Sequence, residues 1–515
     1  MSFETFSANL LRYPDLTFSL DTSLMDIPST FYETMMERVT KAYTDLLALE
    51  DGNVVNPDEE RMVGHYWLRN PELAPTDEIR SSITDTLALL RDFAAKVHTG
   101  EIAPPAGGKF EKLLLIGIGG SALGPQFVYD ALRPAAQMAT YFFDNTDPDG
   151  IDRTLAEIGD LSKTLVLVIS KSGGTPETRN GMLEAEAAYT AAGLEFGQHA
   201  AAITGHGSKL DLYSESNDWL TSFPMEDWVG GRTSIMSTVG LVPLALQGID
   251  LDAFLAGAST MDAHTRETNI RTNAAMQLAL AWHHEGNGRG EKDMVVIPYK
   301  DSLALFSKYL QQLIMESLGK RLDLDGKEVF QGIAVYGNKG STDQHAYVQQ
   351  LRDGVHNFFA TFIEVRQGRA GESIEVEPGV MAGDYLQGFL RGTRKALYQS
   401  GRRSITISIE EVTPRTIGAL IALFERAVSF YASLVNINPY HQPGVEAGKK
   451  AATLFLELLA DVKDILSEKA QTAEALASAL RADPEEVYHC LTHLAANEKA
   501  VLESGSSPRE DRFRS

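Results

Sequence analysis

Two loops of this chain combine hydroxyl groups with glycines in a way that suits a phosphate. The apolar run 166–169 leads into one of them, and a proline-started helix follows it: Ser170, Lys171, Ser172, Gly173, Gly174, Thr175. Hydroxyls, backbone N–H groups and a helix N-terminus can all point at one anion, and the two glycines remove Cβ atoms that would block its approach. An ordinary βα turn with Ser and Thr caps is the alternative for this loop alone. The loop favours a phosphorylated small molecule.

The second loop, 116–125, also follows an apolar run and opens a helix. Its residues of interest are Gly117, Gly119, Gly120, Ser121 and Gly124. Their spacing differs from the G-x-G-x-x-G dinucleotide motif. That motif also has an acidic residue further along the chain that binds the ribose, and no acidic residue stands clearly at that spacing here. A sugar or phosphate loop fits better, and both loops can face one crevice at the carboxyl edge of a parallel sheet.

Two further segments carry charged side chains beside glycines or on one helix face. Arg232 follows Gly230 and Gly231, and its planar donors suit a phosphate or an oxyanion, although a surface salt bridge is the default for an arginine. Gln312, Glu316 and Lys320 are spaced to share one helix face, although such a face is more often merely solvated.

The last two segments are individually weak. His345 follows Gln344 after the turn 340–343, and Lys449 ends the segment that starts at Gln442. With 12 histidines in the chain, a single one is more often structural, and a single lysine is more often exposed.

The elements that must position these residues alternate between apolar runs and helical periodicity. This pattern predicts parallel sheets covered by helices on both faces. Strands are expected at 112–118, 141–145, 164–170, 200–204, 293–299, 329–336, 358–365 and 404–409. Helices are expected at 237–247, 251–267 and 271–285, before a glycine-rich turn at 286–290 that marks a boundary. The chain therefore reads as two successive α/β domains.

The C-terminal part reads as helical. The pattern is helical over 415–469 with a break at 438–444, and two short capped helices are expected at 472–480 and 483–494. The last residues, 504–515, are expected to be frayed and polar.

Composition excludes several classes of protein. The 515 residues include 70 Asp plus Glu against 46 Lys plus Arg, so the formal charge of −24 opposes binding to nucleic acid or an anionic membrane. The single cysteine, Cys490, allows no intrachain disulfide and no thiolate metal cluster. Residues 1–23 do not form a secretory signal, and no apolar run approaches the ~18 to 20 residues that span a bilayer. We expect a cytoplasmic protein.

Taken together in their order along the chain, these six segments resemble the glucose-6-phosphate isomerase family over roughly 113–450. The resemblance implies an α/β fold of two sugar-isomerase (SIS) three-layer αβα domains with parallel sheets, here with a helical C-terminal extension, assembled as a homodimer. It also implies interconversion of glucose 6-phosphate and fructose 6-phosphate in glycolysis and gluconeogenesis, by ring opening and a cis-enediol, with no metal and no cofactor. We divide the chain into an N-terminal, mainly helical segment, two sugar-isomerase domains, a helical segment with the catalytic lysine and a small tail: 1–110, 111–285, 286–435, 436–470 and 471–515.

The same resemblance implies roles for individual residues. Glu316 becomes the base that moves a proton between C1 and C2, and Arg232 supplies positive charge for the enediolate. His345, from the neighbouring subunit, and Lys449 open the sugar ring. Binding of the phosphate and sugar oxygens falls on Gly120, Ser121, Ser170, Lys171, Ser172, Thr175, Gln312 and Gln442.

Three positions depart from the family pattern. Thr233 stands where an aromatic residue is common, Leu318 where Asn is usual and His441 where Asp is common. None of them is a proposed proton-transfer residue, but pocket shape and sugar discrimination can differ.

Three alternatives remain. One is a non-catalytic sugar-phosphate sensor, because the tail has the look of a small helix-turn-helix, although it has few basic residues. Another is an isomerase with a different or broader substrate such as mannose 6-phosphate. The third is an amidotransferase-type isomerase, which would normally bring an N-terminal cysteine nucleophile that this chain lacks.

Overall fold

The computed structural model describes residues 2–515, apart from the side chains of residues 445–447 and 449. The chain divides into two compact units, of which the first ends at His441 and the second is Gln442–Ser515. The division into five segments that we expected from the sequence stays a prediction.

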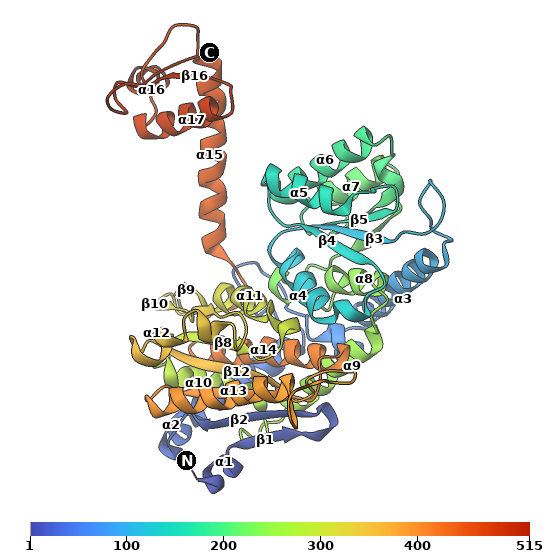
Figure 1. The fold of residues 1–515 in the computed structure, drawn as a ribbon, viewed down its shortest axis with the longest axis vertical. Helices are drawn as coiled ribbons and strands as arrows, with labels where there is room; N and C mark the ends of the chain where they lie inside the picture. The colour runs from blue at the N-terminus through green and yellow to red at the C-terminus, as the bar shows by residue number, and fades with distance from the viewer. Residues whose placement is uncertain (1) are drawn as a thin grey trace. The chain divides into compact units, whose positions relative to one another are not determined.

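The first sheet of the larger unit has five strands, all parallel, in the order β4-β3-β5-β6-β7 (Figure 1). The strands are β3 (Lys112–Ile116), β4 (Ala139–Phe143), β5 (Thr164–Ser170), β6 (Ala200–Thr204) and β7 (Thr221–Pro224). Successive side chains of a strand point to opposite faces, so a sheet covered on both sides needs continuous apolar strands. One face packs on α5 (Pro148–Ile158), α6 (Pro176–Ala191) and α7 (Lys209–Ser216). The other packs on α3 (Asp77–Thr99), α4 (Leu123–Leu132) and α8 (Thr238–Leu246).

The second sheet has six strands in the order β1-β2-β15-β12-β8-β11. They are β1 (Leu10–Tyr13), β2 (Phe18–Leu24), β8 (Asp293–Pro298), β11 (Val335–Tyr336), β12 (Phe358–Val365) and β15 (Ser404–Ile409). The last four are parallel, whereas β2 runs antiparallel to β15 and to β1. Helices α12 (Val348–Asp353) and α13 (Ala382–Gln399) cover one face, and α10 (Ala274–Glu285) and α14 (Pro414–Leu434) cover the other. The α/β fold class with helix-covered sheets is confirmed.

One sequence prediction about this sheet is wrong, and two of its strands were not expected. The strand expected at 329–336 is broken into β10 (Glu328–Gln331), which pairs with β9 (Lys320–Leu322), and the separate β11. Phe330 has a left-handed φ of +48°, which bends the chain out of an extended run. The N-terminal strands β1 and β2 were not expected, although the helices α1 (Phe3–Ala8), α2 (Ser29–Glu50) and α3 account for much of that region.

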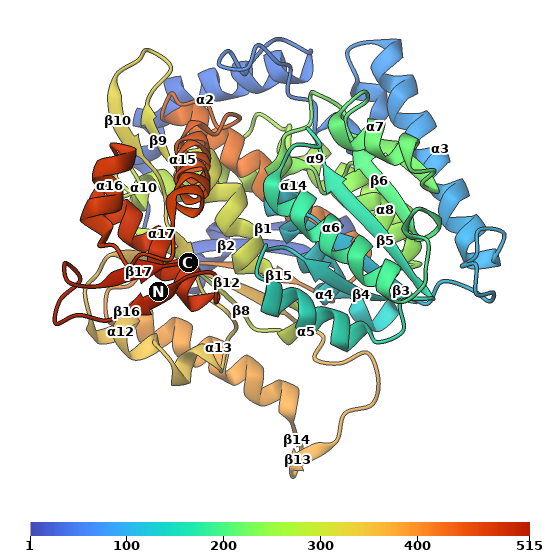
Figure 2. The ribbon, with the colours of Figure 1, turned by 90° about the horizontal axis from the view of Figure 1, so that it is seen from above.

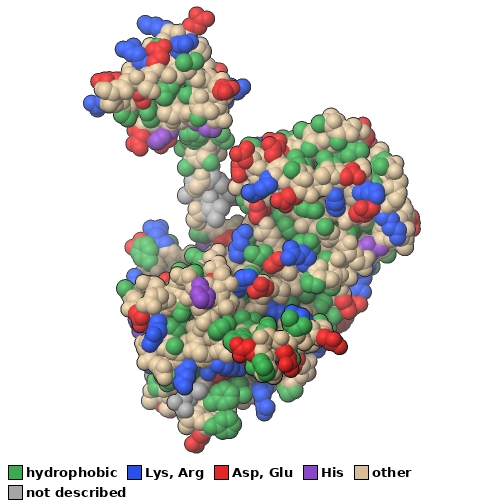
Figure 3. Space-filling view, in the orientation of Figure 1, with side chains coloured by type: hydrophobic (Ala, Val, Ile, Leu, Met, Phe, Trp, Pro, Cys, Tyr) green, Lys and Arg blue, Asp and Glu red, His purple; other side chains and the backbone are tan. Residues whose placement is uncertain are grey.

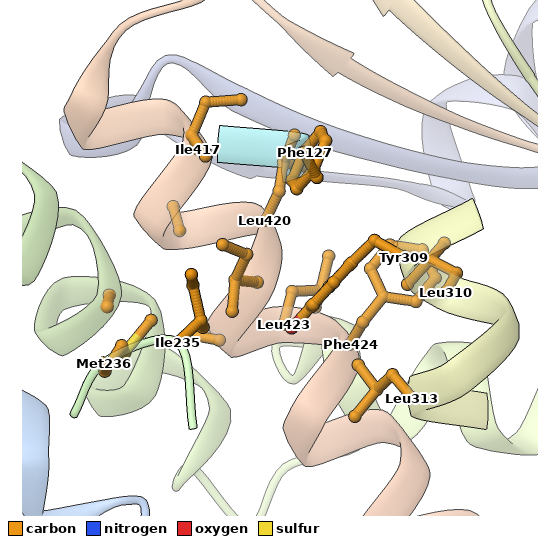
Figure 4. Close-up of a cluster of buried hydrophobic side chains, with 14 of the residues drawn as sticks. Phe127, Ile235, Met236, Tyr309, Leu310, Leu313, Ile417, Leu420, Leu423 and Phe424 are labelled. Atoms are coloured by element: carbon orange, nitrogen blue, oxygen red, sulfur yellow. The ribbon is translucent and has the colours of Figure 1, made fainter. Parts of the chain in front are cut away.

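Helix α14 is the centre of the larger unit. Within the described residues it is the one helix long and apolar enough to cross a bilayer, but 94% of its apolar window is buried inside the protein, as in a core helix. Its partners include α9 (Leu251–Thr265) and α10. Figure 4 shows the side chains gathered around it: Phe127 of α4, Ile235 and Met236, Tyr309 and Leu310 of α11 (Phe306–Leu310), Leu313, and its own Ile417, Leu420, Leu423 and Phe424. The segments that carry Arg232 and Glu316 therefore rest on one core.

The second unit contains α15 (Pro443–Ile465), α16 (Ala473–Leu480) and α17 (Pro484–Ala496), followed by the hairpin of β16 (Val501–Glu503) and β17 (Arg512–Arg514). The two short helices are confirmed. The expected fraying of 504–515 is wrong, because Phe513 pairs with Leu502 and is fully buried among the helices. One large aromatic side chain anchors an otherwise polar end.

A further hairpin, formed by β13 (Glu375–Glu377) and β14 (Val380–Met381), extends away from the second sheet (Figure 2). On the face shown in Figure 3, acidic and basic side chains are interspersed over the first unit. The net negative charge is therefore spread over this face of the unit, among basic side chains, and is not gathered in one acidic patch.

Candidate active site

The strand order of the first sheet reverses between β3 and β5. From β3 the chain passes to β4 on one side and then returns to β5 on the other. In open α/β sheets, ligands bind at the carboxyl ends of the strands where the order reverses in this way. The loops that follow these two strands are the glycine loop 117–122 and the hydroxyl loop 171–175. The two loops predicted to face one crevice thus lie on either side of the switch point.

The hydroxyl loop is shaped by one glycine and its own hydrogen bonds. Gly173 has φ +64°, and a Cβ there would lie 2.2 Å from the backbone nitrogen of Leu210. The Ser170 hydroxyl donates to Oγ1 of Thr175 at 3.2 Å, and Oγ of Ser172 accepts from the N–H of Gly174 at 3.2 Å. Thr175 caps α6 without a side-chain bond to its first N–H groups. Those N–H groups and the helix dipole suit an anion.

Lys171 ties this loop to the arginine motif. Its Nζ donates to the carbonyl oxygens of Asp227 at 2.8 Å and Val229 at 3.1 Å, immediately before Gly230 and Arg232. Burial lowers the pKa of Lys171. The ammonium group of Lys171 therefore links the hydroxyl loop to the backbone before Gly230. Its role in phosphate binding stays a prediction.

The glycine loop packs directly against the arginine motif. A Cβ at Gly120 would lie 2.0 Å from the carbonyl oxygen of Gly231, and one at Gly119 would lie 3.2 Å from Nε2 of Gln312. Gly119, Gly120 and Ser121 are half-buried, whereas Gly231 is exposed. Because Gly119 and Gly120 have no side chains, the glycine loop can approach both the arginine motif and the segment of Gln312.

Arg232 and Glu316 form the charged centre of the site. Nη2 of Arg232 lies 3.2 Å from Oε1 of Glu316, and the two side chains are 6% and 20% exposed. Glu316 ends a π turn, Gln311–Glu316, that continues α11, and such turns are often found at functional sites. The expected single helix face through Lys320 is wrong, because the helical turns end before Gly319 and Lys320 starts β9. Lys320 nevertheless reaches back, and its Nζ donates to the carbonyl oxygen of Glu316 at 2.7 Å.

Further contacts among the described residues hold the guanidinium group. Nη1 donates to the carbonyl oxygen of Pro439 at 2.9 Å and to Oγ of Ser317 at 3.5 Å, and Nη2 donates to the carbonyl oxygen of His441 at 3.3 Å. These acceptors could not be read from residue types, because a backbone carbonyl is present at every residue. Burial lowers the pKa of Arg232, against the effect of Glu316. Burial, together with the charge of Arg232, lowers the pKa of Lys320 to about 7.

The remaining predicted residues of the site are His345, Gln442 and Lys449. His345 is exposed in the turn Asp343–His345, and among the contacts of the described residues none links it to Arg232 or Glu316. Gln442 opens the second unit, and the side chain of Lys449 lies outside the described residues. Their roles stay predictions.

The three departures from the family pattern have different surroundings. Thr233 is buried and donates to the carbonyl oxygen of Gly230 at 3.3 Å, and Leu318 is fully buried in the core. Nε2 of His441 lies 3.6 Å from a carboxylate oxygen of Asp58. His441 therefore borders the arginine through its carbonyl group, whereas Leu318 contributes to the core.

Comparison with known proteins identifies the family of this chain. The phosphoglucose isomerase family model matches residues 25–476. A glucose-6-phosphate isomerase of Rippkaea orientalis is 59% identical over 504 residues, covering 96% of this chain and 95% of the relative. That of Thermosynechococcus vestitus is 58% identical over 513 residues, covering 98% and 97%. The crystal structure of a glucose-6-phosphate isomerase from Chlamydia trachomatis superposes with a TM-score of 0.80 at 27% identity, covering 89% of this chain and 92% of that one. With most of its length matched in sequence and fold, the chain belongs to the phosphoglucose isomerase family.

Proposed function

We infer that this protein interconverts glucose 6-phosphate and fructose 6-phosphate, as an isomerase of glycolysis and gluconeogenesis. Relatives 58–59% identical over nearly the whole chain are glucose-6-phosphate isomerases. The observation that carries the inference is the Arg232–Glu316 pair, 3.2 Å apart beside the two loops of the switch point. A carboxylate next to a fixed guanidinium group is what proton transfer α to a carbonyl requires.

In the proposed reaction, ionised Glu316 takes the proton from C2 of the open-chain aldose and returns it to C1 of the cis-enediol, while the hydroxyl proton of O2 passes to O1, so that C2 becomes the carbonyl carbon of the ketose. Negative charge develops on the sugar oxygen as the C2–H bond breaks, and Arg232 stabilises it. The arginine is held by carbonyl acceptors before the substrate arrives, so little reorganisation is needed in the transition state. The steps reverse for the ketose.

The phosphate is proposed to bind at the hydroxyl loop, through Ser170, Ser172, Thr175 and the N-terminus of α6, with Lys171 nearby. Gly120, Ser121, Gln312 and Gln442 are proposed to contact the sugar. Binding energy from the non-reacting phosphate then orients C1 and C2 against Glu316.

Ring opening is proposed to use Lys449 and His345 of a second subunit, so the active form is a homodimer. The exposure of His345 supports this, because an exposed side chain remains available to a partner. The hairpin of β13 and β14, which projects in Figure 2, and α13 also carry exposed apolar side chains typical of an interface: Ile374 (72% exposed), Val376 (47%), Phe389 (43%) and Tyr385 (40%). A second copy of the chain is the proposed occupant of that surface.

A sensor that binds nucleic acid through its tail is disfavoured. Over residues 442–515, acidic side chains outnumber basic ones by 13 to 9, and such a charge repels a phosphate backbone. We also propose that the enzyme works in the cytoplasm, where a chain with one cysteine needs no disulfide.

The test is turnover of fructose 6-phosphate by the purified protein, with a chelator present and mannose 6-phosphate assayed in parallel. Glu316→Gln should lower kcat by about 10²- to 10⁴-fold, the usual contribution of a general base. Glu410→Gln, an exposed carboxylate elsewhere, is the matched control and should keep the parent kcat. A parent without turnover would refute the assignment, and a Glu316→Gln variant with parent kcat would refute the choice of base.

A further inference from the structure

Arg232 owes its position to a short non-helical segment, 438–441, between α14 and α15. Two of its carbonyl groups, those of Pro439 and His441, accept hydrogen bonds from the guanidinium group. Any movement of this segment would therefore turn the arginine relative to Glu316. The residues that fix the segment control the geometry of the charged centre.

Tyr440 anchors the segment 438–441 to helix α14. It lies between the two carbonyl acceptors in sequence, and its hydroxyl donates to Oγ of Ser429 on α14 at 3.0 Å. Its backbone N–H donates to Oδ1 of Asn438 at 3.0 Å, which closes a tight local turn. The phenol thus links the loop to the central helix through one side-chain bond.

Ser429 is held in place by further hydrogen bonds of its own. Its Oγ lies 2.7 Å from the hydroxyl of Tyr66 and donates to the carbonyl oxygen of Glu425. The guanidinium groups of Arg69 and Arg426 lie over the Tyr66 ring, 4.7 and 4.3 Å from its centre. These arginines pair with buried carboxylates, Arg69 with Glu425 and Arg426 with Asp262, each at 2.6 Å. A dense network of buried ion pairs resists displacement.

We propose that Tyr440 is a positioning residue for the isomerisation. Its hydroxyl bond to Ser429 holds the carbonyl groups of Pro439 and His441 where they aim Arg232 at the enediolate oxygen. The proposal rests on the function proposed above. Because the negative charge exists only in the transition state and the intermediate, loss of this anchor lowers kcat and leaves substrate binding nearly unchanged.

The experiment compares three variants that each remove one hydroxyl. Tyr440→Phe deletes the anchor, Ser429→Ala deletes its acceptor, and Tyr66→Phe is the matched control, since Tyr66 shares the acceptor but does not hold segment 438–441. We expect the first two to lower kcat about tenfold with KM within about twofold of the parent, because small displacements of a catalytic group cost this much or more. Tyr66→Phe should keep the parent kcat. In a double-mutant cycle, the effects of Tyr440→Phe and Ser429→Ala should not add.

Inhibitor binding separates positioning from a general structural role. Arabinonate 5-phosphate carries a carboxylate where the enediolate is charged, whereas sorbitol 6-phosphate is uncharged there. Tyr440→Phe should weaken the first about tenfold and leave the second unchanged, with a Tm close to that of the parent.

Three results would overturn the proposal: parent kcat in Tyr440→Phe, equal weakening of both inhibitors, or an equal loss of kcat in Tyr66→Phe. Failure of the proposed function itself would appear separately, as absence of turnover in the parent protein.

Discussion

The close approach of Gly120 to the backbone of Gly231 gives a specific prediction for the variant Gly120→Ala. A methyl group at this position would lie 2.0 Å from the carbonyl oxygen of Gly231, whereas ordinary contact begins near 3.4 Å. The two loops must therefore separate by roughly 1.4 Å. The loop that moves either carries Arg232 or lies against Gln312.

The expected loss follows from that displacement. A misplacement of about 1 Å can lower the rate about 100-fold, so kcat/KM should fall by about two orders of magnitude. Overpacking of this kind destabilises by about 1–3 kcal/mol, so the Tm should fall by only a few degrees.

The assay is steady-state isomerisation of fructose 6-phosphate together with thermal unfolding. Gly231→Ala is the matched control, because its new methyl group meets no atom within 4 Å. It should retain the parent Tm and lose much less activity. Parent kcat/KM in Gly120→Ala would refute the conclusion that this close approach sets the position of Arg232.

Three other predictions concern charge and packing. Burial lowers the pKa of Lys320 from 10.5 to about 7, so between pH 7 and pH 10.5 the unfolded chain binds more protons than the folded chain. The free energy of unfolding should therefore rise with pH over this range, by up to about 5 kcal/mol. Urea unfolding of Lys320→Met should lack this part of the rise, and an identical pH profile would contradict the reasoning. Arg69→Met leaves the buried carboxylates of Glu425 and Asp262 short of a partner, so it should lower the free energy of unfolding by about 3–5 kcal/mol in denaturant titrations, and a change below about 1 kcal/mol would count against it. Phe513→Ala should destabilise the C-terminal unit by about 3–5 kcal/mol, seen as early hydrogen exchange of α16 and α17, and unchanged protection there would show that the aromatic anchor is dispensable.

Strands buried on both faces were the most predictable part of the fold. The bounds of β5, β6, β12 and β15 agree with the apolar runs read from the sequence. Such strands need apolar side chains at consecutive positions, so the one-dimensional pattern contains the information. By contrast, β1 and β2 pair at the sheet edge, where long-range partners decide the structure.

Irregular backbone was the least predictable part. Nothing in the residue types at 311–316 distinguishes a π turn from an α-helix, and the left-handed Phe330 gives no local signal. The π turn packs on a distant segment, through Leu313 against α14 (Figure 4), whereas Phe330 is exposed, so its conformation is not explained by core packing.

The sequence by itself determined the chemical groups of this protein: the glycines, hydroxyls, the arginine and the carboxylate, in an order that resembles one family. Only the tertiary structure decided how they act together. It placed Nη2 of Arg232 3.2 Å from Glu316 and chose the carbonyl groups of Pro439 and His441 as its supports. The physical reason is that residue type fixes which bonds a side chain can make, whereas distance and orientation come from segments far apart in the sequence that meet only when the core packs.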